Sequence, residues 1–91
     1  WDHHCLTDAG VRTRHLCAFF PDLARPTLSK WLNGRAHPHK FLLDRALDVQ
    51  AAVQQAVALG ELPITAPHLS EHERTNRVIT VLKKHLPERD D

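Results

Sequence analysis

The sequence predicts an all-α domain of about five helices, and three observations support this fold class. Apolar residues recur at intervals of three and four along much of the chain, which is the pattern of one helical face. Glycine and proline residues divide the chain into about five pieces of helical length. No segment has the pattern of a convincing strand. The length of 91 residues suits one small domain.

Two short helices are expected at the start of the chain. The first covers about residues 2–9 and ends at Gly10, a natural helix C-terminus. The second covers residues 13–20, with Thr13 as its N-cap and Pro21 directly after it. Its apolar residues are Leu16, Cys17, Phe19 and Phe20.

A third short helix is expected over residues 25–33. Pro26 falls in its first turn, where the missing N–H of proline costs nothing. Gly34 ends the helix. Its apolar residues share one face, at spacings of three and four: Leu28, Trp31 and Leu32.

Two longer helices are expected in the C-terminal part. The fourth covers residues 39–59, and its apolar stripe consists of Leu42, Ala46, Val49, Val53 and Ala56, widened by Leu43, Leu47 and Val57. The fifth covers residues 70–85 and begins with a capping box, in which Ser70 caps the helix and Glu73 reaches back. The tail from Pro87 to Asp91 is expected to be solvated.

The second and third pieces form a recognisable unit, "TRHLCAFFPDLARPTLSKWLNGRAHP". Two short helices are joined by a tight turn, and the second helix has a buried face and ends on glycine, which is the pattern of a helix-turn-helix. The stretch resembles the lambda-repressor-like (Xre-type) helix-turn-helix family over residues 13–38. The positions that match are Thr13 at the cap, Ala18 at the close helix crossing, Leu28 and Trp31 in the core, Asn33-Gly34 at the helix end, and Pro38. Asp22 replaces the usual turn glycine, and Pro21 stands where an apolar residue is usual.

This resemblance implies a DNA-binding surface on the third helix and the residues around it. The implied base contacts are Arg25, Pro26, Thr27 and Ser29, and the implied backbone contacts are Arg14, Lys30, Asn33, Arg35, His37 and Lys40. Arg25 is the foremost candidate, because a guanidinium pairs bidentately with guanine O6 and N7. Arg14 falls at the start of the second helix, where the helix N-terminus attracts phosphate.

The charge distribution favours this surface, although the net charge is only +1. Residues 11–40 hold six lysines and arginines and a single acid, Asp22. Positive charge therefore gathers on the predicted helix-turn-helix, as contact with phosphates requires.

The C-terminal helices predict a role in assembly. We expect residues 1–60 to form the DNA-binding domain, and residues 61–91 to form a linker and a helix that packs on the fourth helix or dimerises. Regulators of this kind bind as symmetric dimers on two half-sites. The candidate dimerisation residues are Val53, Val57, Val78, Ile79 and Leu82. The predicted function is that of a small bacterial or phage transcriptional regulator, in the cytoplasm, with no cofactor.

Other functions have weaker support. The main alternative is a protein-binding module that uses the same fold to sequester or inhibit a partner. An enzyme is not expected, because there is no ordered nucleophile and base and no phosphate-binding glycine loop. The opening Asp2-His3-His4-Cys5 resembles the motif of membrane palmitoyltransferases, but the chain has only two cysteines and no apolar run of about 18 residues. The eight histidines match no familiar zinc spacing, so we expect no metal site and mostly solvated histidines.

Overall fold

The fold is all-α, as predicted. The computed structural model describes residues 1–87, and the expected solvated tail at 88–91 lies outside them. It has five α-helices and one 3-10 turn: α1 (His3–Asp8), α2 (Thr13–Leu16), α3 (Arg25–Leu32), η1 (Lys40–Leu42), α4 (Leu43–Ala58) and α5 (Glu71–His85). The described residues contain no strand.

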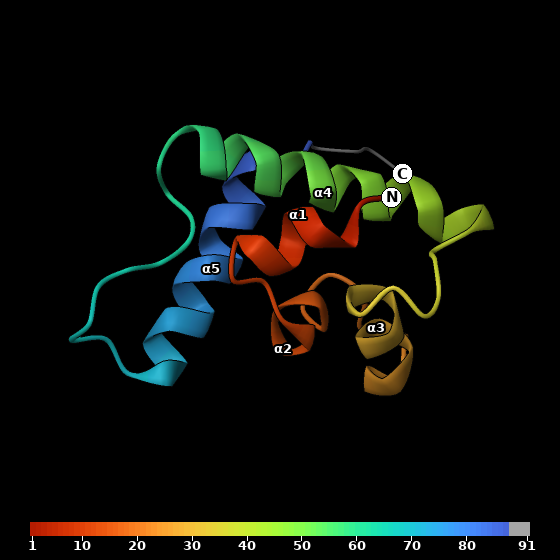
Figure 1. The fold of residues 1–91 in the computed structure, drawn as a ribbon, viewed down its shortest axis with the longest axis horizontal. Helices are drawn as coiled ribbons and strands as arrows, with labels where there is room; N and C mark the ends of the chain where they lie inside the picture. The colour runs from red at the N-terminus through yellow and green to blue at the C-terminus, as the bar shows by residue number, and fades with distance from the viewer. Residues whose placement is uncertain (88–91) are drawn as a thin grey trace.

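The helices enclose one core. Helix α1 lies between α4 on one side and the α2–α3 pair on the other, and α5 packs against both α4 and α2 (Figure 1). The core draws on every α-helix and on the linker through Leu62. Trp1 and Cys5 are partly buried against this core, in line with the expected inward face of the first helix.

Helix α2 is shorter than predicted, and its start is different. It ends at Leu16, and residues 17–20 continue as turns in which the Phe19 N–H donates to the Leu16 carbonyl at 2.9 Å. Phe19 and Phe20 are both buried, and Pro21 disfavours helical geometry at Phe20. The N-cap is Arg12 rather than Thr13.

Helix α3 agrees closely with its prediction. Pro26 lies in the first turn, Asn33 is the C-cap, and Gly34 has a φ of +79°. A Cβ on Gly34 would meet the His3 ring at 2.9 Å, so this position is restricted by a neighbour as well as by its backbone. Ala18, expected at the crossing of the second and third helices, is exposed, and Leu16 is the buried residue there.

The C-terminal helices pack against each other. Helix α4 begins later than predicted, after the η1 turn, where Lys40 has a φ of 56°. Its expected stripe is buried at Ala46, Val49, Val53 and Ala56. In α5 the Ser70 hydroxyl accepts the Glu73 N–H at 3.1 Å, as predicted, but within residues 1–87 the Glu73 side chain does not reach back to Ser70.

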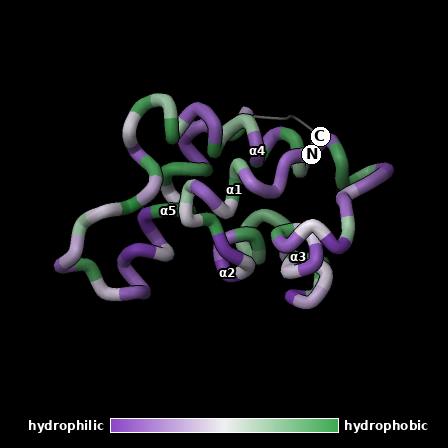
Figure 2. Tube along the Cα trace, viewed as in Figure 1, coloured by the Kyte–Doolittle hydropathy of each residue, from purple (hydrophilic) through white to green (hydrophobic). Residues whose placement is uncertain are grey.

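The two halves of α5 have different roles. Its first turns are hydrophilic (Figure 2), and they approach α2. Its second half carries Val78 and Leu82, which are buried in the core that α4 and α5 share. One helix therefore holds α4 through apolar packing and α2 through polar contacts.

Candidate nucleic-acid interface

Helix α3 separates its residues into a buried and an exposed face. Leu28, Trp31 and Leu32 are buried, and the Trp31 ring contacts Phe20 edge-on at a centroid distance of 5.3 Å. All ten residues predicted to contact DNA are exposed: Arg14, Arg25, Pro26, Thr27, Ser29, Lys30, Asn33, Arg35, His37 and Lys40. The core residues of α3 thus fix which side of the helix faces solvent.

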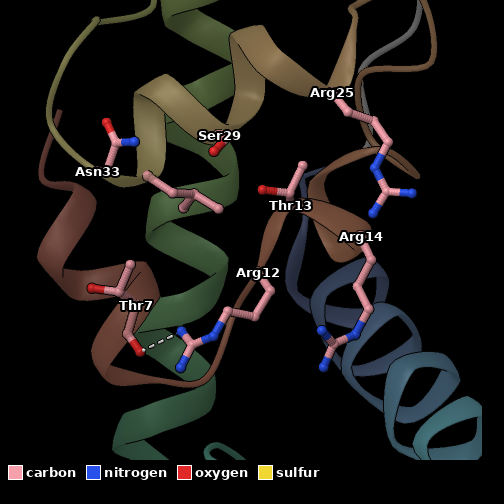
Figure 3. A pocket seen from close by; sticks show the side chains of 8 residues that line it. Thr7, Arg12, Thr13, Arg14, Arg25, Ser29 and Asn33 are labelled. Atoms are coloured by element: carbon pink, nitrogen blue, oxygen red, sulfur yellow. Dashed lines mark hydrogen bonds between the residues drawn. The ribbon is translucent and has the colours of Figure 1, made fainter.

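A pocket of about 350 Å³ lies between α3, the start of α2 and the end of α1. Figure 3 shows three arginines around it, Arg12 and Arg14 from the start of α2 and Arg25 from the start of α3. The remaining lining residues are Thr7, Thr13, Ser29, Leu32 and Asn33. Hydroxyl, amide and guanidinium groups in one concave site are suited to hold a phosphate group.

The pocket brings together only part of the predicted interface. Arg14, Arg25, Ser29 and Asn33 line it, and Arg25, Ser29 and Asn33 follow one another at intervals of four along the same side of α3. The other predicted residues of the helix, Pro26, Thr27 and Lys30, are exposed but do not line the pocket, and Arg35, His37 and Lys40 are in the segment that follows α3.

Besides the core residue Leu32, three pocket residues were not among the predicted contacts: Thr7, Arg12 and Thr13. Arg12 is anchored by α1, because its Nη1 donates to the Thr7 carbonyl at 3.1 Å. The only signal for Arg12 in the sequence is its place in the basic segment. Thr7 comes from α1, and its position beside α2 depends on the packing of the two helices.

Arg14 is already engaged with α5. Its Nη2 lies 3.2 Å from the Glu71 carboxylate, and its Nε donates to the Thr75 hydroxyl at 3.2 Å. The side chains of this ion pair are 42% and 77% exposed, respectively, so the pair is well screened by solvent. Helix α2 has only four residues, and we therefore assign no phosphate site to its N-terminus, in contrast to the prediction.

Among the described residues, the other cations of the basic segment have no carboxylate partner. Within residues 1–87, no ion pair involves Arg12, Arg25, Lys30, Arg35 or Lys40. Their charge is consequently available to a ligand from outside. Asn33 orders the segment after α3, because its Oδ1 accepts the Arg35 N–H at 3.1 Å.

His15 departs furthest from the expectation of mostly solvated histidines. It is 1% exposed, and its Nδ1 accepts the Arg12 N–H at 2.8 Å. Burial lowers the pKa of His15 to about 4, and the nearby charges of Arg14 and Arg12 act in the same direction. The ring is therefore neutral at pH 7.

The predicted dimerisation set is corrected by the packing of α4 on α5. Val53, Val78 and Leu82 are buried within the chain, so they cannot form a surface for a second copy. Ile79 is partly buried against the same core, and Val57 remains exposed. Of the two expected arrangements of the C-terminal helix, the structure has the one in which it packs on helix four.

Comparison with known proteins assigns the chain to no family. No protein-family model matches the chain, and no curated protein or solved structure matches it. Across residues 1–87, no group of three or more His, Cys, Asp or Glu side chains is arranged to hold a metal ion. None of the described helices is both long and apolar enough to cross a membrane.

Proposed function

We propose that this protein binds double-stranded DNA, with α3 in the major groove and the pocket of Arg12, Arg14 and Arg25 against the phosphate backbone. The observation that carries the proposal is the pocket itself, which three arginines line beside the exposed face of α3. Helix-turn-helix proteins place a recognition helix in the groove and contact phosphates from its flanks.

The two parts of this surface have different roles in the proposal. Arg25 is at the start of α3, where it reaches a base edge, and a bidentate contact to guanine contributes about 1–3 kcal/mol of discrimination. Arg12, Arg14, Lys30 and Arg35 supply sequence-independent attraction to phosphates. Ser29 and Asn33 contribute donors and acceptors between these cations.

The finer proposal is a bacterial or phage transcriptional regulator that acts as a homodimer. One helix-turn-helix contacts only a short stretch of DNA, so a pair related by two-fold symmetry reads two half-sites. Because three of the expected interface residues are buried, such a dimer has to use exposed residues such as Val57. Sedimentation velocity of the chain with and without a selected DNA site measures this directly.

Fluorescence anisotropy tests DNA binding. We expect affinity for a random-sequence duplex at low salt, with log K falling linearly as log salt concentration rises. On a site selected from a randomised library, Arg25→Ala weakens binding about 5- to 150-fold, which corresponds to the loss of about 1–3 kcal/mol.

Arg77→Ala is the matched control, because Arg77 is an exposed arginine on α5 that does not line the pocket. Arg77→Ala removes one positive charge, as Arg25→Ala does, and should leave the affinity for DNA nearly unchanged if the pocket is the DNA site. Absence of binding at low salt, or equal losses in the two variants, would refute the proposed surface.

A protein-binding module is the second candidate, and one observation favours it. Phe41 is 97% exposed, directly after Lys40 with its positive φ, and exposed aromatic residues are typical anchors of protein interfaces. A chain that binds no DNA at any salt, and keeps affinity for a protein partner after Arg25→Ala, has this function instead.

A further inference from the structure

A second cavity, of about 200 Å³, lies where α1, α2, the linker and α5 meet. Three arginines line it: Arg12 and Arg14 from the start of α2, and Arg74 from α5. The rest of the wall is largely apolar and includes Ile64 of the linker and Val78 of α5. The cavity therefore combines a cationic side with a hydrocarbon side.

The guanidiniums of Arg12 and Arg74 are held in place by neutral groups. Arg74 donates from Nε to the Leu69 carbonyl at 3.2 Å and from Nη2 to the Ala66 carbonyl at 3.0 Å. Arg12 donates to the Thr7 carbonyl. Carbonyl oxygens orient a guanidinium without cancelling its charge, and each guanidinium has five donors, so donors remain for another acceptor.

The balance of charge at the cavity is positive. Glu71 is the one carboxylate within ion-pair distance of these arginines in residues 1–87, and it pairs with Arg14. Three guanidiniums against one exposed carboxylate leave an unneutralised cationic cluster. Arginine forks match the two oxygens of a carboxylate in bidentate geometry.

His15 is one of the residues that line the cavity, and its ring carries one unpaired polar atom. Because its Nδ1 accepts the Arg12 N–H, the neutral ring carries its proton on Nε2. That Nε2 is buried and has no hydrogen-bond partner among residues 1–87.

The size of the cavity limits the ligand to a small molecule. An apolar cavity of about 150 Å³ holds benzene, so about 200 Å³ accommodates a compact hydrocarbon body with one acidic group. We infer that this cavity is a binding site for a small organic acid, with the carboxylate on Arg74, Arg14 and Arg12 and the apolar body against Ile64 and Val78. Arg12 and Arg14 also line the pocket between α2 and α3, so the two sites share a wall.

NMR titration of the whole chain with benzoate tests the inference. Benzyl alcohol serves as the neutral analogue of the same shape, and sodium chloride keeps ionic strength constant. We expect saturable shifts at Gly10, Ile64 and Val78, with affinity for benzoate at least about tenfold above that for benzyl alcohol, because charge-assisted hydrogen bonds form only with the acid. Equal affinity for the two compounds, or shifts spread evenly over the surface, would overturn it.

Arg74→Gln is expected to lower benzoate affinity about tenfold or more, and Arg77→Gln is the matched control on the same helix. Equal losses in both variants argue against the site. If Arg74→Gln does not fold, because Arg74 also anchors the linker, Arg14→Gln provides the same test with the Arg74 anchors intact. These measurements do not involve DNA, so a failed DNA-binding assay and a failed ligand assay remain distinguishable.

Discussion

The α2–α3 region and the α4–α5 region differ in how far their charged side chains are paired with opposite charges. In the first, Arg12, Arg25 and Lys30 have no carboxylate partner within residues 1–87, and Arg14 alone forms an ion pair. In the second, Glu61 at the start of the linker binds both Lys84 and His85 near the end of α5. These hydrogen bonds hold the pKa of the Glu61 carboxyl below its usual range.

The two regions also differ in how they are packed. Helix α3 is fixed by aromatic contacts, with Trp31 between Trp1 and Phe20 at centroid distances of 6.1 and 5.3 Å. Helix α4 instead buries small residues, among them Ala52 and Ala56, against its neighbours. The comparison indicates that the α4–α5 region pairs charges within itself and buries small apolar residues, whereas α2 and α3 present cations and polar groups to solvent.

The largest expected effect comes from breaking the aromatic contacts under α3. Trp31→Ala removes the side chain that meets both Trp1 and Phe20, and we expect a loss of about 3–5 kcal/mol in the free energy of unfolding. Urea denaturation followed by far-UV circular dichroism measures it. Phe41→Ala is the control, since that ring is exposed and its removal should change stability by less than about 0.5 kcal/mol. Similar losses in the two variants would mean that Trp31 is not part of the core.

A second effect concerns the pH dependence that buried His15 confers. Its pKa falls from 6.5 to about 4 on folding, so between these values the unfolded chain takes up a proton that the folded chain does not. Stability therefore falls as pH falls, and we expect His15 to account for about 2 kcal/mol between pH 7.5 and pH 5.

His15→Gln isolates this contribution, because glutamine does not titrate. The loss of stability between pH 7.5 and pH 5, from urea denaturation, should be about 2 kcal/mol smaller in this variant than in the unmodified chain. His68→Gln, at an exposed position, is the control for the substitution itself. An unchanged slope in His15→Gln would show that this histidine is not buried in the neutral form.

The smallest effect concerns the ion pair between Arg14 of α2 and Glu71 of α5, which joins the two regions. Glu71→Gln removes the carboxylate that pairs with Arg14, and on the proposed function it should raise DNA affinity up to about fivefold, since an exposed ion pair contributes about 0–1 kcal/mol. Anisotropy at low salt measures it. Glu73→Gln changes the net charge equally but breaks no ion pair within residues 1–87, so it should have the smaller effect. Equal effects would assign the change to net charge alone.

Local signals predicted α3 and α5 almost to the residue. Pro26 marks the start of α3 because its ring fixes φ near the helical value, and Gly34 marks the end because glycine adopts a positive φ without strain. Both effects are independent of the rest of the chain. Ser70 marks the start of α5 for the same reason, through its bond to the Glu73 N–H. The exposure of the predicted contact residues on α3 followed from the apolar face of that helix, which periodicity alone defines.

The end of α2 and the dimerisation set could not be predicted in the same way. Helix α2 ends at Leu16, and turns carry the buried Phe19 and Phe20, which the apolar pattern of residues 16–20 did not distinguish from a longer helix. The pattern of α4 and α5 showed that they have apolar faces but not what covers those faces. Val53, Val78 and Leu82 are buried because the linker is long enough to return α5 to α4 within one chain.

The sequence by itself determined the helical class, the position and solvent-facing side of α3, and the gathering of cations in residues 11–40. Those properties depend on contacts between residues three or four apart, or on composition alone. Only the tertiary structure decided that Arg12, Arg14 and Arg25 line one pocket, that Arg14 pairs with Glu71, and that His15 is buried. These depend on which helices pack together, and the Arg14–Glu71 contact joins residues 57 positions apart in the chain.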